Sequence, residues 1–184
     1  WCVSLFQNII VIILLISAAG FLSLTEIALA GARKVKLKIL AESGEIRAQK
    51  VLDLQEQSAD FFAASQIGLN AIAILGGILG EGAFRPYFVE FVARFYTGPW
   101  LETIGFALSF TLVTSLFILF ADLMPKRLAM NAPEKISIRV IEPIQIFIKI
   151  CKPLAWGINA IANLLFRLFK VNTIRDDNIT FDDI

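Results

Sequence analysis

Two acidic side chains occupy similar positions in this sequence, each near the end of a long apolar run and ahead of basic residues. Asp122 lies in FILFADLMPKRLAM, where Pro125 and Lys126 follow it. Glu26 lies in FLSLTEIALAGARK, where a basic cluster begins at Arg33. A carboxylate in apolar surroundings needs a cationic or hydrogen-bonding partner. The two parallel settings therefore predict one shared site that holds a cation.

Helical spacing places further polar side chains beside these acids. Each of three apolar runs carries one polar stripe in steps of three and four residues: Ala19, Ser23, Glu26 and Ala30; Gln66, Asn70, Ala73 and Gly77; and Thr111, Ser115, Ile118 and Asp122. These stripes should face one another or water, because charges and amides in hydrocarbon cost several kcal/mol. Asn70 would lie about 14 Å into its run at a helical rise of about 1.5 Å per residue. The sequence therefore predicts a negatively charged cavity that reaches mid-membrane.

The composition is typical of a membrane protein. Of 184 residues, 57% are hydrophobic and 18% are charged, and the mean hydropathy is +0.72. The net charge of +1 disfavours nucleic acid as a partner. The chain has no histidine, no CxxC spacing and no phosphate-binding glycine loop, so zinc, redox and nucleotide sites are disfavoured. We therefore expect no enzymatic activity and no cofactor in this segment.

Three apolar runs are long enough to cross a bilayer, which predicts membrane helices at about 4–30, 61–80 and 103–124. Basic residues cluster after the first and third runs, so those ends should be cytoplasmic, with the N-terminus periplasmic and the C-terminus cytoplasmic. Between the first two runs, helical sequence on both sides of Gly44 predicts a hairpin. The expected fold is an all-α integral membrane protein: three transmembrane helices, a cytoplasmic helical hairpin and juxtamembrane interfacial helices.

The remaining segments are predicted from their prolines and aromatic residues. The connection 81–102 should be an outer loop, since it mixes charges of both signs with aromatic residues. Pro133, Pro143 and Pro153 should break the segment after residue 132 into short helices near the membrane surface.

Simpler interpretations of these residues stay open. Asp122 could pair with Lys126 or Arg127 at the membrane surface, and Glu26 with Arg33 or Lys34. Serine and threonine hydroxyls in membrane helices often bond the carbonyl four residues earlier. Close helix packing would explain Gly76, Gly77 and Gly80, of which Gly76 and Gly80 have the spacing typical of small residues at a helix interface. Pro125, in contrast, would free a carbonyl near residue 121 to face a cation.

Three motifs resemble one known family in the same order and spacing. They are SLTEIALAGARKVKLKILAESGEIRAQKVL, the Ile-Gly-x-Asn of QIGLN, and ADLMPKRLAMNAPE, and together they run from Ser23 to Glu134. The chain resembles the transmembrane domain of the CorC/CNNM family of cation transporters. The resemblance implies a homodimer in the bacterial inner membrane, with three transmembrane helices per chain and a belt of juxtamembrane helices.

The same resemblance implies how the chain is divided. Residues 1–141 would form the transmembrane domain, 142–170 the juxtamembrane helical belt, and 171–184 the start of a linker. The partners implied beyond that linker are a pair of cytosolic CBS domains and a CorC-type domain.

The resemblance also implies the cation-binding residues. These are Ser23, Thr25, Glu26, Asn70, the carbonyl of Ala121, and Asp122. If magnesium is the substrate, its ligands would be drawn from Ser23, Glu26, Asn70 and Asp122.

The chain departs from the usual family pattern within these motifs. Ala121-Asp122 replaces a common Gly-Glu, Leu69-Asn70 replaces a pair of asparagines, and Ala73 replaces a later asparagine. Fewer oxygens and a shorter acid would weaken the near-octahedral cage that magnesium requires at about 2.1 Å. These variants resemble the branch of the family linked to export of putrescine and cadaverine. A diamine needs separated acceptors and an apolar path for its methylenes.

Three hypotheses follow. The preferred one is an exporter of small organic dications such as putrescine and cadaverine. The second is efflux of magnesium or another divalent cation, with sodium exchange as an option. The third is a membrane anchor that transports nothing and carries a regulatory cytosolic region.

Overall fold

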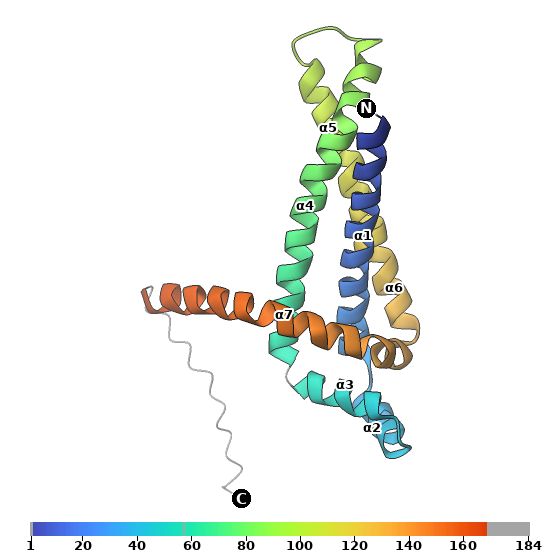
Figure 1. Cartoon of the computed structure of the whole chain (residues 1–184), viewed down its shortest axis with the longest axis vertical. Helices are drawn as coiled ribbons and strands as arrows, with labels where there is room; N and C mark the ends of the chain where they lie inside the picture. Colours follow the sequence, from blue (N-terminus) through green and yellow to red (C-terminus); the bar gives the residue numbers. More distant parts are fainter. Residues whose placement is uncertain (1, 57, 169–184) are drawn as a thin grey trace, which may run out of the picture.

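The computed structural model describes residues 2–56 and 58–168, and these residues contain helices and no strand. Three long helices stand side by side (Figure 1). Their bounds are α1, Cys2–Gly31; α4, Ser58–Ala93; and a third formed in succession by α5, Leu101–Leu116, the π-helix η1, Phe117–Leu123, and α6, Met124–Asn131. All three are long and apolar enough to cross a membrane, over Phe6–Gly31, Phe61–Ala93 and Leu101–Asn131. The predicted all-α class with three candidate spans is confirmed.

The second span is longer than the sequence predicts. It continues to Ala93 rather than ending near residue 80, and it contains Pro86. The charges that indicated a loop are partnered across two helices: Arg85 lies 3.8 Å from Glu81 and 3.2 Å from Glu102 of α5. The Arg85 guanidinium also lies 5.9 Å from the ring centroid of Phe106. The outer-loop prediction for 81–102 is therefore wrong for its first thirteen residues, 81–93, which are helical.

The third span contains a π-helical segment just ahead of Pro125. Seven residues, Phe117–Leu123, adopt the wider turn. A position for a Cβ on Gly20 of α1 would lie 3.2 Å from Pro125 Cγ and 3.3 Å from the Phe120 carbonyl oxygen, so α1 approaches this segment closely. The extra residue per turn rotates residues before position 117 relative to those after it. The predicted continuous stripe from Thr111 to Asp122 is therefore wrong.

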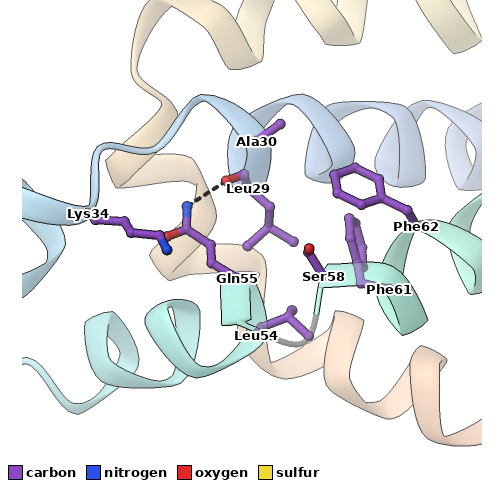
Figure 2. Close-up of a pocket in the computed structure, with 8 residues that line it drawn as sticks. All are labelled: Leu29, Ala30, Lys34, Leu54, Gln55, Ser58, Phe61 and Phe62. Atoms are coloured by element: carbon purple, nitrogen blue, oxygen red, sulfur yellow. Dashed lines mark hydrogen bonds between the residues drawn. The ribbon is translucent and has the colours of Figure 1, made fainter. Parts of the chain in front are cut away.

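The predicted helical hairpin is confirmed. It consists of α2, Lys34–Glu42, and α3, Ile46–Glu56, and Gly44 between them has a φ of 99°. This left-handed conformation suits glycine, which has no Cβ. Gln55 of α3 connects the hairpin to the end of α1, because its side-chain amide donates to the Leu29 carbonyl at 2.7 Å (Figure 2). The same amide donates to the Ala32 carbonyl at 3.0 Å. These carbonyls at the end of α1 have no partner within a regular helix.

Helix α7, Pro133–Leu168, lies across the lower ends of the upright helices (Figure 1). Pro143 and Pro153 are inside it, so the prediction of short helices broken at these prolines is wrong. One proline removes a single helical hydrogen bond, and the face that α7 buries favours its continuation. The boundary placed between residues 141 and 142 falls inside α7, and the division into domains stays a prediction. The proposed linker at 171–184 lies outside the described residues.

Glu134 joins the first turn of α7 to the start of the hairpin. Lys36 lies 3.4 Å and Arg33 4.0 Å from its carboxylate. The pKa of Glu134 is lowered, first by a hydrogen bond from its own backbone N–H and then by Lys36. A carboxylate at a helix N-terminus is also favoured by the helix dipole.

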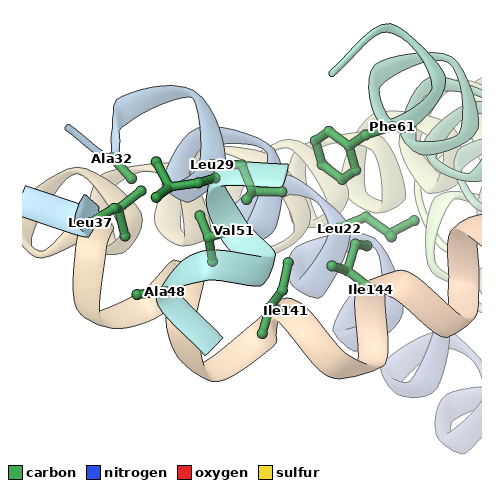
Figure 3. Close-up of a cluster of buried hydrophobic side chains, with 10 residues drawn as sticks. Leu22, Leu29, Ala32, Leu37, Ala48, Val51, Phe61, Ile141 and Ile144 are labelled. Carbon is green, nitrogen blue, oxygen red and sulfur yellow. The ribbon is translucent and has the colours of Figure 1, made fainter. Parts of the chain in front are cut away.

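One buried apolar cluster connects α1, the hairpin, α4 and α7 (Figure 3). Its members are Leu22, Leu29, Ala32, Leu37, Ala48, Val51, Leu52, Phe61, Ile141 and Ile144. Fully burying a valine, leucine, isoleucine or phenylalanine side chain contributes roughly 1.5–3 kcal/mol. The cluster therefore fixes the lower ends of two spans against α7 and the hairpin.

Glycines let α4 approach the third span closely. A Cβ on Gly80 would lie 2.6 Å from Val113 Cγ1, and one on Gly76 would overlap the ring of Phe117. A Cβ on Gly82 would meet nothing within 4 Å. The close-packing interpretation is therefore confirmed for Gly76 and Gly80 and is wrong for Gly77, where a Cβ would also meet nothing within 4 Å.

This difference between glycines gives a stability prediction. Gly80→Ala should destabilise the protein by about 1–3 kcal/mol relative to Gly82→Ala, because both gain the same helix propensity but only the first overpacks. Thermal unfolding of the purified protein in detergent measures the difference. Equal midpoints for the two variants would contradict the packing assignment.

Candidate functional site

A cleft of about 350 Å³ lies among all three spans. Its lining residues are Ala19 and Glu26 from α1; Gln66, Leu69, Asn70 and Ala73 from α4; Phe117, Ile118, Ala121 and Asp122 from η1; and Lys126 from α6. Acids, amides and a lysine thus share one space with apolar walls. The cleft brings together most of the residues that the sequence predicts for a cation site.

Asp122 is held from two helices at once. Its Oδ1 accepts a hydrogen bond from Ser23 Oγ of α1 at 2.9 Å and lies 2.6 Å from Lys126 Nζ of α6. Ser23 is fully buried, whereas the Asp122 side chain is 48% exposed. The predicted alternative, pairing of Asp122 with Lys126, is confirmed. Both partners nevertheless line the cleft, so this pair is part of the candidate site.

Glu26 lines the cleft without the partners that the sequence suggests. Among the described residues, no lysine or arginine nitrogen lies within 4.0 Å of its carboxylate. Arg33 instead contacts Glu134, as does Lys36. The alternative in which Glu26 pairs with Arg33 or Lys34 is therefore not found in this part of the structure.

Two amides of α4 lie along the cleft one helical turn apart. Asn70 was predicted for the site, and its side chain is exposed to this space. Gln66 lines the same cleft but is absent from the predicted cation-binding set. Its spacing of four residues from Asn70 in an apolar run was the available signal. Lys126, which the sequence indicates only as a surface partner of Asp122, also lines the cleft.

Of the other residues predicted for the cation site, Ala121 lines the cleft and Thr25 does not. Ala121 lines the cleft, and Pro125 has no amide hydrogen to donate to its carbonyl. Thr25 is fully buried, and its hydroxyl donates to the Phe21 carbonyl at 2.7 Å. Thr25 is not among the lining residues, so the structure does not bring it to the cleft. Ser115 similarly donates to the Thr111 carbonyl at 2.7 Å.

A second cavity, of about 250 Å³, differs in chemistry (Figure 2). Its lining residues are Leu29, Ala30, Lys34, Leu54, Gln55, Ser58, Phe61 and Phe62. These described residues include a lysine and no acid, so nothing in the lining would neutralise a bound cation.

The charges of the main cleft favour a cation. Glu26 and Asp122 contribute −2 and Lys126 contributes +1, which gives a net charge of −1. Amide oxygens and apolar walls from both α4 and η1 complete the lining. Within residues 2–56 and 58–168, no group of three or more histidine, cysteine, aspartate or glutamate side chains is placed to hold a metal ion. The arrangement suits binding of a cation by a few separated acceptors.

The fold and cleft define a multi-pass membrane protein whose three spans surround an acid-lined cleft. Residues 10–184 match the family model for CNNM, the Cyclin M transmembrane N-terminal domain. The chain therefore belongs to the CNNM family, which confirms the resemblance drawn from its motifs.

Several bacterial relatives are similar over nearly all of this chain. The polyamine export protein of Escherichia coli (strain K12) is 49% identical over 178 residues, covering 97% of this chain and 40% of the relative. The polyamine export protein of Haemophilus influenzae is 43% identical over 180 residues, covering 98% and 42%. A UPF0053 protein of Synechocystis is 29% identical over 174 residues, covering 94% and 39%. The chain spans about two-fifths of the length of these curated relatives.

Proposed function

We propose that this chain is the membrane part of an exporter of small organic dications, with putrescine and cadaverine as its substrates. The observation that carries the proposal is that Glu26 and Asp122 face one apolar-walled cleft formed by all three spans. Each acid would receive one ammonium group, and Asn70 would line the path beyond. The relatives named polyamine export protein support this assignment of substrate.

The lining of the cleft favours a diamine over a compact metal ion. Leu69, Ala73 and Phe117 offer hydrocarbon surface against which methylenes can pack. Magnesium instead requires near-octahedral oxygen ligands, and Asp122 Oδ1 is already shared by a serine hydroxyl and a lysine ammonium.

Two other functions are each favoured by a specific observation. The oxygens of Glu26, Asn70 and Asp122 line one cleft, and hard oxygens of this kind suit magnesium as a substrate, directly or through water. The 2.6 Å pair between Asp122 and Lys126 suits a membrane anchor in which the acid is only structural.

The proposed setting is the bacterial inner membrane, with the N-terminus periplasmic, the C-terminus cytoplasmic and the cleft open to the cytoplasm. The basic residues of α2 and α6 support this orientation by the positive-inside rule. We further propose a homodimer, whose interface would cover part of the apolar surface that one chain leaves exposed, and cytosolic CBS domains as partners in a longer chain.

Efflux measurements on the full-length protein test these assignments. Bacterial cells that express it, loaded with labelled putrescine or cadaverine, should lose label faster than cells with an empty vector. Magnesium efflux measured in the same cells should be unchanged. Export of magnesium alone would establish the second function, and export of neither would favour the anchor.

A further inference from the structure

Lys126 places an ammonium group of the protein where the substrate's ammonium would bind. Its Nζ lies 2.6 Å from Asp122 Oδ1, and the lysine itself lines the cleft. The same Oδ1 accepts the hydrogen bond from Ser23. One carboxylate oxygen of the site is thus paired with a cation that belongs to the chain itself.

The helix positions this lysine, and its side chain is partly exposed. It lies four residues after Asp122, so both side chains occupy one helix face. Its side chain is 35% exposed, and lysine carries its charge on a flexible four-carbon stem. Arg127, the next basic residue, is exposed and is not a lining residue. Of these two adjacent basic residues, the geometry therefore assigns only Lys126 to the cleft.

The charges of the cleft lining indicate that Lys126 weakens the binding of a dication. The lining carries −1 with Lys126 present, so a bound diamine would raise the total to +1. With Lys126 withdrawn, the two carboxylates would balance the two ammonium groups. Like charges held close together repel, so the lysine and the substrate should exclude each other at Asp122.

We propose that Lys126 is a tethered competitor of the substrate, a statement that rests on the proposed diamine export. It occupies the Asp122 carboxylate in the empty protein, withdraws when a diamine binds, and returns to displace the diamine. Its tether gives it a high effective concentration at Asp122. The Asp122 carboxylate therefore always has a cation beside it. The diamine binds less tightly as a result, and it is released faster.

A lysine that competes with the substrate at Asp122 predicts a change in selectivity that a salt bridge remote from the bound amine does not. In the wild type, Lys126 occupies Asp122 and only Glu26 is open to an ammonium group of the substrate. The second ammonium of a diamine therefore adds little binding free energy. Without the lysine charge both acids are open to the substrate, so the affinity for a diamine should rise more than the affinity for a monoamine. The ratio of putrescine to butylamine affinity is therefore the decisive quantity.

The test uses two neutral variants of the full-length protein, Lys126→Gln and Lys126→Met. Methionine keeps an unbranched apolar side chain, so it serves as the second variant if the glutamine amide disturbs packing. Both variants should bind putrescine about tenfold and butylamine about threefold more tightly than wild type, since a monocation feels about half of the electrostatic change. Maximal putrescine export should fall because release is slower. Arg127→Gln, which removes the neighbouring charge outside the cleft and keeps Lys126, should resemble wild type.

Other results would overturn the proposal. An unchanged putrescine to butylamine ratio in both neutral variants would leave the pair as a structural salt bridge. Weaker binding of both amines would make Lys126 a positioning residue for Asp122. If wild-type protein binds putrescine, either result removes the competitor and leaves the export proposal standing. If wild-type protein binds neither amine, both proposals fail together.

Discussion

Asp122→Asn and Glu26→Gln are each expected to reduce diamine export by at least about tenfold while the protein still folds. Each change keeps the shape of the side chain and one acceptor oxygen. Each also raises the charge of the lining from −1 to 0, because the cleft holds two acids and one lysine. That charge offsets the desolvation of a dication entering the site. Efflux of labelled putrescine from cells measures the loss.

The control for these variants is neutralisation of an acid outside the cleft. Glu90 pairs with Arg94 at 3.8 Å near the end of α4, and its side chain is 74% exposed. Glu90→Gln should leave export unchanged. If Asp122 were only a structural partner of Lys126, Asp122→Asn would cost about 1 kcal/mol or less of stability and export would persist. Wild-type efflux of every cation in both cleft variants would favour the anchor.

The spans and the hairpin could be predicted because their signals are local. An apolar run of sufficient length indicates a span, and a glycine between two helical segments indicates a turn, as found at Gly44. The end of α4 could not be predicted, because its charges are matched by Glu102 and the ring of Phe106 on another helix. The continuity of α7 through two prolines likewise depends on the partners that cover its buried face.

The candidate site was predicted where a polar side chain in an apolar run identifies it. Glu26, Asn70 and Asp122 stand out in apolar runs, and all three line the cleft. Thr25 carried no comparable signal, since its direction depends on how α1 packs, and its hydroxyl bonds its own helix. The polar face of the third span could not be predicted across the π-helical segment, because an α-helical repeat does not reveal a wider turn.

Restoring the family's usual residues should separate diamine from magnesium transport. Leu69 and Asp122 both line the cleft, so Leu69→Asn with Asp122→Glu would replace apolar wall by an amide and extend one acid into the space. Binding of magnesium should strengthen, since a hard cation gains oxygen ligands. Diamine export should fall severalfold, because the path narrows and loses surface for the methylenes.

The two substitutions act on different parts of the site, so each also needs its own comparison. Leu69→Met keeps the wall apolar at similar volume and should retain putrescine export, whereas Leu69→Asn alone should impair it. Isothermal titration with magnesium and with putrescine, alongside efflux in cells, follows both ligands in every variant. A double variant that exports putrescine as well as wild type would show that the apolar wall does not select the substrate. A gain in magnesium affinity without loss of diamine export would mean that the two cations use different parts of the cleft.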